Sequence, residues 1–599
     1  MSGAPGRGPI DDVVSWPAPV EDSSGNDMHG AKQDQVSVAE TFLRALKRRG
    51  IDYVFANAGT DFAPIIEALV RLEDRADEIP RFITVPHENL AVAMAHGFYL
   101  VNGRPAAVMV HVTVGTGNTI CALMNANRDN VPLLLMAGRT PITQRGHIAS
   151  RSAPIHWGQE NFDQAGIVRE YTKWDFELRA GQNVDEVVGR ALDVALAEPH
   201  GPVYLTLPRE VLANPDIADA EAPAVTAPVI ADPQPSPSHV ETVAEWIAAA
   251  EWPLIVTSHV GRDLAAAAAL AELAESFAIP VTEPGATCVN LPASHPMSLG
   301  QAGGTLLSKA DVIVVVDAEV PWFPRAFTPA PGVKVAHLGV DPLWTRYPIR
   351  SFPADVAIPG SARTALRLLA DALAAQRADA GKVAARRAEM AAHRAELDAR
   401  RAKVLAEASS AKPIRYDWLG ECVRAALPPG GIVVTELGAW PHQLALDEPG
   451  SLIGVGIGGG LGFALGASLG AKLAAPQRTV ITTVGDGSYM FGNPTPFHLV
   501  ARAAGLPVLT IVCNNGRWQA VDSATRVVYP DGRAAAAQPM PLVELAPSPE
   551  FTKVAEASDA FARRVDEPED LPAAIRDALE AVHGGRQALL DVRMEHGVR

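Results

Sequence analysis

Two short motifs near the C-terminus combine residue types that can hold a metal ion and a phosphate group. They are Gly485-Asp486-Gly487 and Asn514-Asn515. The Asp486 carboxylate and the Asn515 amide oxygen are hard oxygen ligands of the kind that Mg²⁺ prefers. The glycines allow backbone N–H groups to approach a phosphate, and a helix that follows would present its positive N-terminus to it. An ordinary βα turn followed by a polar turn is the alternative to a binding site.

The segments around these motifs predict a βαβ unit. Residues 479–484 and 507–513 are apolar runs typical of buried strands, and residues 494–504 are typical of a helix that Gly505 ends. This spacing supplies the crossover that two parallel strands require. The two motifs would therefore lie at the carboxyl ends of parallel strands, where open α/β sheets bind ligands.

Length and composition exclude several classes of protein. The chain has 599 residues, 48% of them hydrophobic and 20% charged, which predicts about three or four domains with large cores. The net charge of −17 argues against a nucleic-acid binder and leaves no basic patch for a membrane surface. The four cysteines are far apart and lie mostly in apolar segments, which predicts a reducing compartment. No secretory signal is visible, so we expect a cytoplasmic protein.

Three consecutive α/β blocks with parallel sheets are predicted along the chain. In the first block, a helix over 38–49 alternates with strands over 53–56, 106–112 and 133–136. The predicted units are a disordered tail (1–36), a first α/β block (37–214), a Pro/Ala-rich linker (215–238), a central block (239–374), a charged helical linker (375–412) and a third block (413–599).

A glycine-rich apolar run, Leu452–Ala471, could suggest a membrane helix or a dinucleotide site. It is too rich in glycine for a membrane helix. It contains Gly454-x-Gly456-x-x-Gly459, but the acidic residue that a dinucleotide site requires about 20 positions later is missing. We therefore predict a buried loop followed by a helix.

The two opening motifs, in this order of blocks, resemble those of thiamine-diphosphate (ThDP) enzymes of the acetolactate synthase and benzoylformate decarboxylase superfamily. The resemblance covers residues 37–595. It implies that the first block binds the aminopyrimidine ring, that the third block binds the diphosphate with Mg²⁺, and that the central block sometimes holds FAD or ADP. It also implies a homodimer or homotetramer, in which the cofactor lies between the first block of one subunit and the third block of another.

Three residues of the first block are assigned a catalytic part by this resemblance. Glu88, in Val85-Pro86-His87-Glu88-Asn89, matches the carboxyl group that activates the cofactor beside its aminopyrimidine ring. His111 begins His111-Val112-Thr113-Val114-Gly115-Thr116-Gly117-Asn118, which resembles the stretch of benzoylformate decarboxylase whose histidine moves protons near the reacting carbonyl. Thr60 falls where that family has a hydroxyl residue near the substrate. A helix-start carboxylate, a core histidine and a capping threonine are the structural alternatives.

The resemblance also assigns cofactor contacts in the third block. Leu461 would wedge between the two rings of the cofactor, and the Gly459 carbonyl would accept a hydrogen bond from its amino group. Asp486, Asn515 and the backbone of Arg517 would hold the metal ion. The other predicted cofactor contacts are Gly438, Gly485, Gly487 and Ser488.

One departure from the family limits the prediction of the reaction. Benzoylformate decarboxylase has a second catalytic histidine in its central domain, whereas Val320-Pro321-Trp322-Phe323-Pro324 carries aromatic residues instead. We therefore expect a ThDP- and Mg²⁺-dependent enzyme that acts on a 2-oxo acid, either as a decarboxylase or as an acetolactate-synthase-like carboligase. The alternatives are a lyase or decarboxylase of acyl-CoA thioesters, of the 2-hydroxyacyl-CoA lyase or oxalyl-CoA decarboxylase type, and a non-catalytic ThDP-binding paralogue.

Overall fold

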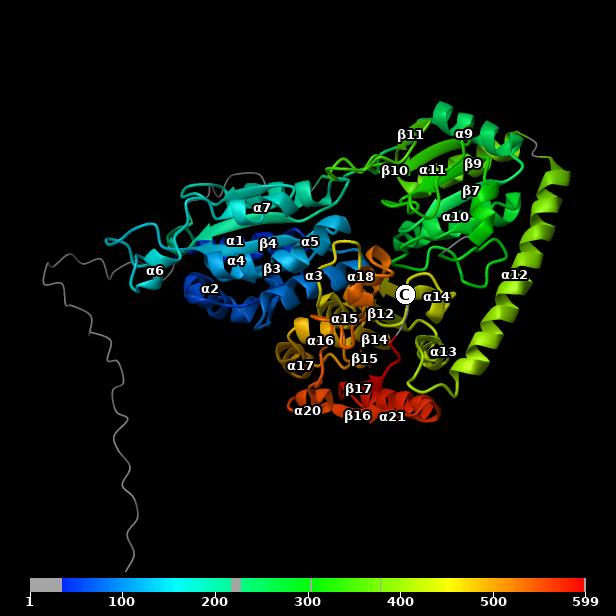
Figure 1. Cartoon of the computed structure of the whole chain (residues 1–599). Helices are drawn as coiled ribbons and strands as arrows, with labels where there is room; N and C mark the ends of the chain where they lie inside the picture. The colour runs from blue at the N-terminus through cyan, green and yellow to red at the C-terminus, as the bar shows by residue number, and fades with distance from the viewer. Residues whose placement is uncertain (1–34, 217–227, 302–303, 377–378, 597–599) are drawn as a thin grey trace, which may run out of the picture.

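The computed structural model describes residues 35–216, 228–301, 304–376 and 379–596. These residues form three parallel sheets, each covered by helices (Figure 1). The three α/β domains predicted from the sequence are therefore confirmed. The tail expected at 1–36 lies outside the described residues up to residue 34, and the expected linker lies outside them over 217–227.

The first domain contains a six-stranded sheet in the order β2-β1-β3-β4-β6-β5, with all its pairings parallel. Its strands are short and almost fully buried, as expected for a sheet that is covered on both faces. The strands are β1 (Tyr53–Ala56), β2 (Arg81–Thr84), β3 (Ala107–Val110), β4 (Leu134–Arg139), β5 (Asp175–Glu177) and β6 (Val203–Pro208). The helices are α1 (Val38–Arg48), η1 (Thr60–Phe62), α2 (Ala63–Arg71), α3 (Glu88–Asn102), α4 (Val112–Asn118), α5 (Ile120–Arg128), α6 (Ile155–Gly158), α7 (Val184–Leu196) and α8 (Arg209–Ala213).

The predicted strand over 106–112 is wrong at its C-terminal end. Strand β3 stops at Val110, and helix α4 begins at Val112 even though β-branched residues there favour a strand. Two hydrogen bonds determine the change. Val112 N donates to the Asp61 carboxylate at 3.3 Å, and Thr116 Oγ1 donates to the Val112 carbonyl at 2.7 Å. The first is with a residue 51 positions away and the second is within α4, so a distant contact and a local one together override the strand preference.

The central domain contains a five-stranded parallel sheet in the order β11-β10-β9-β7-β8. The charged segment predicted to be helical is α12 (Ala380–Ala408), which runs along the side of the molecule from the central domain to the third domain (Figure 1). The other elements are α9 (Pro237–Ala249), β7 (Pro253–Thr257), η5 (Val260–Arg262), α10 (Leu264–Phe277), β8 (Val281–Thr282), β9 (Val312–Val316), β10 (Lys334–Gly339), β11 (Val356–Pro359) and α11 (Ala362–Ala375).

The third domain confirms the predicted βαβ unit. Strand β14 (Val480–Gly485) and strand β15 (Leu509–Asn514) are parallel neighbours, and helix α17 (Pro494–Ala503) lies between them in the chain. The sheet order is β13-β12-β14-β15-β17-β16. The other elements are α13 (Tyr416–Ala426), β12 (Ile432–Glu436), α14 (Pro441–Leu444), β13 (Leu452–Gly454), α15 (Phe463–Ala474), α16 (Asp486–Phe491), α18 (Gln519–Val528), α19 (Arg533–Ala536), α20 (Phe551–Glu556), β16 (Phe561–Val565), α21 (Leu571–His583) and β17 (Ala588–Arg593).

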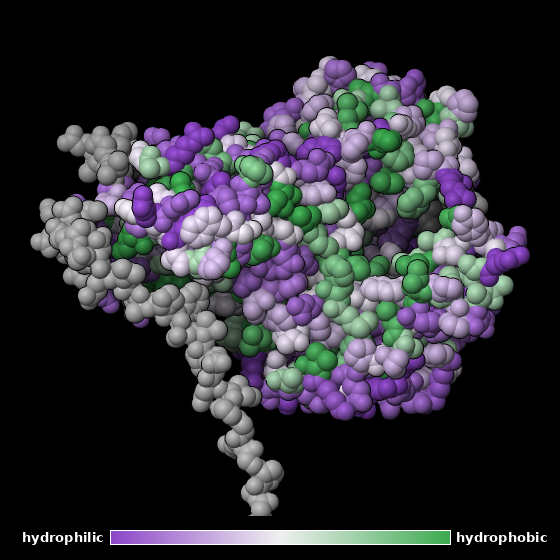
Figure 2. All heavy atoms as spheres, turned by 60° about the vertical axis from the view of Figure 1, so that its left-hand side comes forward, coloured by the Kyte–Doolittle hydropathy of each residue, from purple (hydrophilic) through white to green (hydrophobic). Residues whose placement is uncertain are grey.

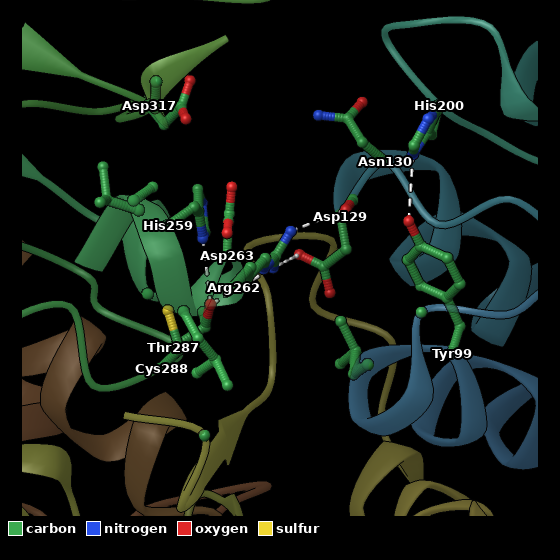
Figure 3. A pocket seen from close by; sticks show the side chains of 18 of the residues that line it. Tyr99, Asp129, Asn130, His200, His259, Arg262, Asp263, Thr287, Cys288 and Asp317 are labelled. Atoms are coloured by element: carbon green, nitrogen blue, oxygen red, sulfur yellow. Dashed lines mark hydrogen bonds and ion pairs between the residues drawn. The ribbon is translucent and has the colours of Figure 1, made fainter. Parts of the chain in front are cut away.

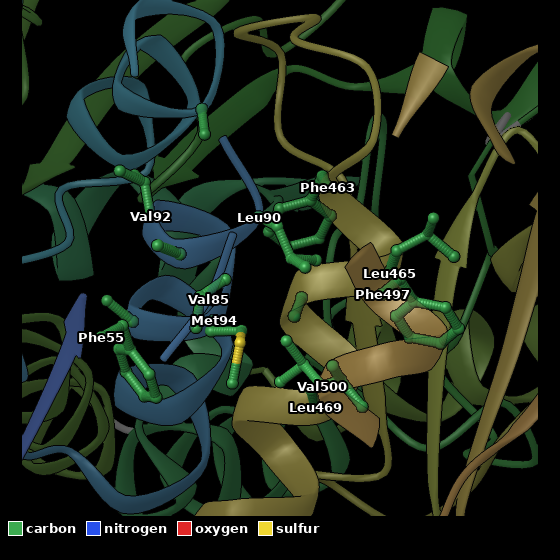
Figure 4. Close-up of a cluster of buried hydrophobic side chains, with 14 of the residues drawn as sticks. Phe55, Val85, Leu90, Val92, Met94, Phe463, Leu465, Leu469, Phe497 and Val500 are labelled. Atoms are coloured by element: carbon green, nitrogen blue, oxygen red, sulfur yellow. The ribbon is translucent and has the colours of Figure 1, made fainter. Parts of the chain in front are cut away.

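Helices α3 and α15 join the first domain to the third. Figure 4 shows Val85, Leu90 and Met94 on one side and Phe463 and Leu469 on the other, and all are members of one buried hydrophobic cluster. The two helices approach closely because glycines face the contact. A Cβ on α3 at Gly97 would lie 2.1 Å from a backbone carbonyl oxygen of α15, and a Cβ on α15 at Gly470 would lie 2.0 Å from a carbonyl oxygen of α3. The run 452–471 is thus a short strand, a loop and a helix, as predicted apart from the strand.

Hydrophilic and hydrophobic side chains are interspersed on the face shown in Figure 2. Among the described residues, no helix is long and apolar enough to cross a membrane. The four cysteines, all within the described part of the chain, are free thiols.

Candidate functional site

The parallel sheet of the first domain brings three site residues to one edge, which is formed by the carboxyl ends of its strands. Strands β2, β1 and β3 are neighbours, so their carboxyl ends lie in a row. Glu88 follows β2, Asn57 follows β1, and His111 follows β3. This edge is the place where parallel sheets present functional groups, and the sheet order is what makes neighbours of residues that are far apart in the chain.

The Glu88 carboxylate is held at the first position of α3 by two amide groups. Asn57 Nδ2 donates to Oε1 at 2.8 Å, and Asn118 Nδ2 donates to Oε2 at 2.5 Å. The residue is only 9% exposed, and the N-terminus of α3 adds a favourable potential for its negative charge. Burial lowers the pKa of the adjacent His87, and the Glu88 charge partly opposes this. Sequence analysis quoted Asn57 and Asn118 within motifs but did not assign their contacts with Glu88.

His111 is bound by a carboxylate that sequence analysis missed. Asp61 Oδ1 lies 2.5 Å from His111 Nδ1, and Asp61 is 3% exposed. This hydrogen bond raises the pKa of His111 above its ordinary value, while burial opposes the rise and the Asp61 charge adds to it. Thr60, which was predicted instead, is exposed and lines the same small cavity as His111. The signal available in the sequence was the Asp that directly follows Thr60 after strand β1.

The third domain places the opening motifs at the carboxyl edge of its own sheet. Asp486 follows β14, Asn515 follows the neighbouring β15, and Gly438 follows β12 on the other side of β14. Asp486 Oδ2 accepts a hydrogen bond from the Gly516 N–H at 2.8 Å. Burial raises the pKa of Asp486 to about 6, and backbone N–H groups oppose this rise. Such a desolvated carboxylate is stabilised when a cation binds beside it.

The other predicted metal ligands lie directly beside Asp486 in this edge. Asn515 Oδ1 accepts from the Arg517 N–H at 3.1 Å, and Asn515 Nδ2 donates to the Tyr416 hydroxyl at 3.4 Å. The Arg517 carbonyl accepts from the Gln519 N–H at 3.0 Å. Within the described part of the chain, no group of three or more His, Cys, Asp or Glu side chains could hold a metal. A metal here would therefore depend on one carboxylate, one amide, one carbonyl and oxygen atoms of a ligand.

The loop that carries Gly459 and Leu461 is held from both domains. Asn125 of α5 makes two hydrogen bonds with the Gly460 backbone, at 2.7 and 2.9 Å. Asn89 Nδ2, one residue after Glu88, donates to the Leu461 carbonyl at 3.4 Å. Gly459 has a φ of 70°, a left-handed conformation that glycine adopts without strain. The loop therefore meets the start of α3 within a single chain.

A second buried carboxylate fixes the end of this loop, and sequence analysis assigned no part to it. Glu436, the last residue of β12, accepts hydrogen bonds from the Gly462 and Ala464 N–H groups, each at 2.8 Å. Burial raises the pKa of Glu436 to about 7, against the effect of these N–H groups. Because Gly462 and Ala464 begin α15, Glu436 takes the place of a capping side chain.

Three segments of the chain match the domains of one family. Residues 36–167 match the N-terminal TPP binding domain of thiamine pyrophosphate enzymes, residues 240–369 match the central domain, and residues 434–592 match the C-terminal TPP binding domain. The chain belongs to the thiamine-diphosphate-dependent enzymes. The family and the fold class inferred from the sequence are thereby confirmed.

Relatives of this ThDP enzyme include both decarboxylases and synthases. Benzoylformate decarboxylase of Pseudomonas aeruginosa is 29% identical over 499 residues, which are 80% of this chain and 85% of the relative. Acetolactate synthase isozyme 1 large subunit of Escherichia coli is 27% identical over 517 residues, which are 84% of this chain and 85% of the relative. The structure of a ThDP-dependent 4-hydroxybenzoylformate decarboxylase of Rhodococcus jostii has a TM-score of 0.73 at 24% identity and covers 94% of this chain and 100% of that chain. This last similarity demonstrates a shared fold.

In this ThDP enzyme, the carboxyl end of the third-domain sheet has features that fit a diphosphate. Ser488 Oγ is buried at the start of α16 beside the Glu436 carboxylate, whose pKa this hydroxyl lowers against the effect of burial. A Cβ at Gly487 would lie 2.3 Å from the Trp518 ring, so only glycine allows this helix start to pack there. A buried hydroxyl two residues after Asp486 suits the oxygen-rich group that the family binds. The donor set therefore fits the cofactor.

A separate cavity of about 960 Å³ lies where the three domains meet (Figure 3). His259, Asp317 and Asp341 follow strands β7, β9 and β10 of the central sheet and line it. Its size would admit FAD or ADP, which the resemblance allowed in the central domain. Its arginines already contact protein groups, and the presence of a nucleotide stays a prediction. These arginines are Arg128, Arg262, Arg346, Arg363 and Arg478.

The aromatic residue that stands near the family's second histidine belongs to the core. Trp322 is buried against Phe327 and Phe352, with ring centroids 5.9 and 5.4 Å apart. The central domain has a buried imidazole at His259, but it lies in the separate cavity and contacts Glu319 at 2.6 Å. Neither residue supplies a proton donor beside His111.

Proposed function

We propose that this chain is a ThDP- and Mg²⁺-dependent enzyme that makes or breaks the carbon–carbon bond beside the carbonyl of a 2-oxo acid. One observation carries the proposal. The stretch that begins at His111 ends at Asn118, and Asn118 donates to Glu88. Through this stretch, the predicted cofactor-activating carboxylate and the predicted proton-moving imidazole form one connected unit, and the Glu88 charge is among the influences that raise the pKa of His111.

The residues that would hold the cofactor lie at the carboxyl ends of the strands in two sheets, those of the first and the third domain. Asp486, Asn515 and the Arg517 carbonyl would bind Mg²⁺, while the Ser488 hydroxyl and backbone groups of Gly438, Gly485 and Gly487 would bind the diphosphate. Leu461 and the Gly459 carbonyl would contact the rings. When bound, ThDP supplies a nucleophilic carbon and an electron sink, which the protein itself lacks.

The side chains of the first domain would control protons around that chemistry. Glu88 would hold a proton on the aminopyrimidine ring, and its two amide partners keep it oriented. His111 would donate a proton from Nε2 to the oxygen of the substrate carbonyl and would take it back later. Because Trp322 belongs to the core, no second imidazole from that segment would protonate the product. The lack of an imidazole from that segment supports a carboligase as an alternative to a simple decarboxylase.

We propose that the active unit is a homodimer or a homotetramer in which the cofactor lies between subunits. Some large apolar side chains are almost fully exposed in the single chain, as expected if contact with another copy covers them. The exposed fractions are 94% for Ile148, 110% for Phe162 and 93% for Leu542. Light scattering on the purified protein would measure the mass of this assembly.

The alternative substrate is an acyl-CoA thioester. The separate cavity of about 960 Å³ supports it, because coenzyme A carries an adenine nucleotide that needs such room. A non-catalytic ThDP-binding paralogue is the alternative from another class.

The deciding experiment offers the purified protein ThDP, Mg²⁺ and a panel of 2-oxo acids, with and without aldehyde acceptors, and identifies products by mass spectrometry. Aldehyde alone would indicate a decarboxylase, a hydroxyketone would indicate a carboligase, and turnover of thioesters alone would indicate the alternative. Cofactor binding without turnover on any substrate would favour the paralogue. Glu88→Gln serves as the control, since equal activity of wild type and variant would contradict the part assigned to Glu88.

A further inference from the structure

Asp61 and His111 form a buried pair that the protein is built to accommodate. The Asp61 carboxylate contacts two consecutive groups of the chain, His111 Nδ1 at 2.5 Å and the Val112 N–H at 3.3 Å. Two glycines make room for it. A Cβ at Gly59 would lie 2.1 Å from His111 Nδ1, and a Cβ at Gly138 in strand β4 would lie 1.8 Å from Asp61 Oδ2. A side chain at either position would therefore displace the pair.

The backbone beside His111 is strained, and Asp61 holds it. Val112 has a φ of 29°, a conformation that β-branched residues rarely adopt and that is energetically unfavourable for them. Its N–H is bound by Asp61, and its carbonyl accepts from Thr116 Oγ1. The sharp turn ends β3 and directs the His111 side chain across the sheet edge towards η1, which carries Asp61. Strain that is maintained in this way at a sheet edge indicates a functional constraint.

The opposite side of the His111 ring meets an amide that suits a protonated imidazole. His111 Nε2 lies 3.3 Å from Gln159 Nε2, and Gln159 Oε1 is buried without a hydrogen-bond partner among the described residues. The two ends of a glutamine amide are assigned from their surroundings, and rotation of the amide would exchange them. With Oε1 facing the ring, Gln159 would accept from Nε2–H, and its unpartnered oxygen would be satisfied.

We propose that Asp61 is a positioning residue that holds His111 as an imidazolium, whose Nε2–H faces Gln159 in this structure and would face the substrate carbonyl when substrate is bound. This inference deepens the proposed function and rests on it for the identity of the reacting group. It assigns to Asp61 the part of an orienting carboxylate, which fixes the ring through Nδ1 and stabilises its positive charge. Thr60, one residue earlier, presents its side chain to the cavity and does not contact the ring through a hydrogen bond that the structure records.

The charged groups that face His111 act in both directions. Asp61 on η1 and Glu88 on α3 favour the imidazolium, while burial opposes it. Arg139 of β4, Arg209 of α8 and His156 of α6 line the same cavity. The two arginines are already bound: Arg139 to Glu160 and Glu177, and Arg209 to three backbone carbonyls. Burial, with the charges of Arg209, Arg151 and His111, lowers the pKa of His156, whereas the pKa of His111 is raised.

The test measures the protonation of His111 directly and requires neither cofactor nor substrate. The full chain is treated briefly with diethylpyrocarbonate between pH 5 and pH 9, and modification of the peptide that contains His111 is followed by mass spectrometry. Only the neutral imidazole reacts, so the midpoint of the rate against pH reports the pKa of His111. The exposed His239 serves as the internal reference. In the wild type we expect a midpoint above 6.5, the ordinary value for histidine.

The Asp61→Asn variant removes the charge and keeps the size of the side chain. We expect its midpoint to fall and its rate of modification at pH 7 to rise, because the carboxylate that favours the imidazolium has been removed. Asp163→Asn is the matched control, since Asp163 pairs with Arg169 at the surface of the same domain. It should leave the rate unchanged. Gly138→Ala keeps the Asp61 carboxylate but displaces it, and it should act in the same direction as Asp61→Asn.

The outcomes separate this inference from the proposed function. A wild-type midpoint at or below 6.5 overturns the inference even if the variants do not fold. An unchanged midpoint in a folded Asp61→Asn variant overturns it as well. A raised wild-type midpoint that falls in Asp61→Asn supports it even when no substrate is turned over, and in that case only the proposed function fails. When a substrate is found, the pH profile of kcat in Asp61→Asn should shift in the same direction as the labelling midpoint.

Discussion

The contact between α3 and α15 predicts that Gly470→Ala is strongly destabilising. The added Cβ would lie 2.0 Å from the Met94 carbonyl oxygen and 2.7 Å from the Phe98 nitrogen, whereas ordinary van der Waals contact begins near 3.4 Å. Both neighbours are backbone atoms of α3, so no side-chain rotation can relieve the overlap. The helices must therefore separate by roughly 1 Å, which a close-packed core resists.

The expected loss is about 3 kcal/mol of the free energy of unfolding, the upper part of the usual range for overpacking, because the clash is with backbone. The separation also displaces the functional site. Glu88 begins α3, and the loop with Leu461 leads into α15. A shift of this size moves Glu88 and the Leu461 loop away from the cofactor that each would contact, and lowers the rate by about 10²-fold. Stability and activity should therefore fall together.

Urea unfolding followed by circular dichroism, with turnover measured on the same preparations, would test this prediction. Gly158→Ala is the matched control, because Gly158 ends helix α6 and has no atom within 4 Å of its added Cβ. It should leave the unfolding midpoint and the activity unchanged. The reasoning fails if Gly470→Ala unfolds at the wild-type urea concentration, because the helices would then not be in the close contact described.

Three further predictions address the site and the domain contacts. Glu88→Gln should keep the fold and the affinity for ThDP but lower turnover by at least about 10²-fold, as measured by steady-state kinetics and titration calorimetry. Asp486→Asn should weaken Mg²⁺-dependent binding of ThDP by at least about tenfold, and retention of wild-type affinity would remove Asp486 from the metal site. Burial would raise the pKa of Asp129, but the charge of Arg262 and the His96 contact hold it below its ordinary range. Arg262→Ala should therefore lower the free energy of unfolding by about 3 kcal/mol at pH 7. Below about pH 4 Asp129 takes up a proton in the variant, so the difference in free energy from the wild type should become smaller. Urea unfolding at both pH values would measure this.

Local patterns were sufficient for most of the secondary structure. The runs 479–484 and 507–513 became β14 and β15 because short, continuous apolar segments rich in β-branched residues suit a sheet that is covered on both faces. The charged segment became α12 because its residues favour a helix and pair along its surface. The end of β3 was mispredicted for the opposite reason. There the chain follows a hydrogen bond to Asp61, which no local pattern contains.

The partners of the site residues lay beyond the reach of sequence reasoning. Glu88 and His111 could be selected by type and spacing, since a resemblance had already given them a part. Asp61 and Asn118 could not be selected in this way, because their parts depend on their hydrogen-bond partners, His111 and Glu88. The same holds for Glu436, whose carboxylate caps α15 from a neighbouring strand. A buried carboxylate acquires its function from its neighbours, and these come from other elements.

The sequence by itself determined the three α/β domains, the family and the residue types available for a metal, a diphosphate and proton transfer, because hydrophobic periodicity and short motifs act over a few residues. The tertiary structure alone decided which of those residues meet. The order of the strands placed β2, β1 and β3 side by side. As a result, Asn118, at the end of the helix that follows His111, contacts Glu88. Close packing of α3 on α15 then brought the first domain to the loop of the third. The first depends on a contact between residues 30 positions apart and the second on one between residues 372 positions apart, and no local pattern records the energy of either.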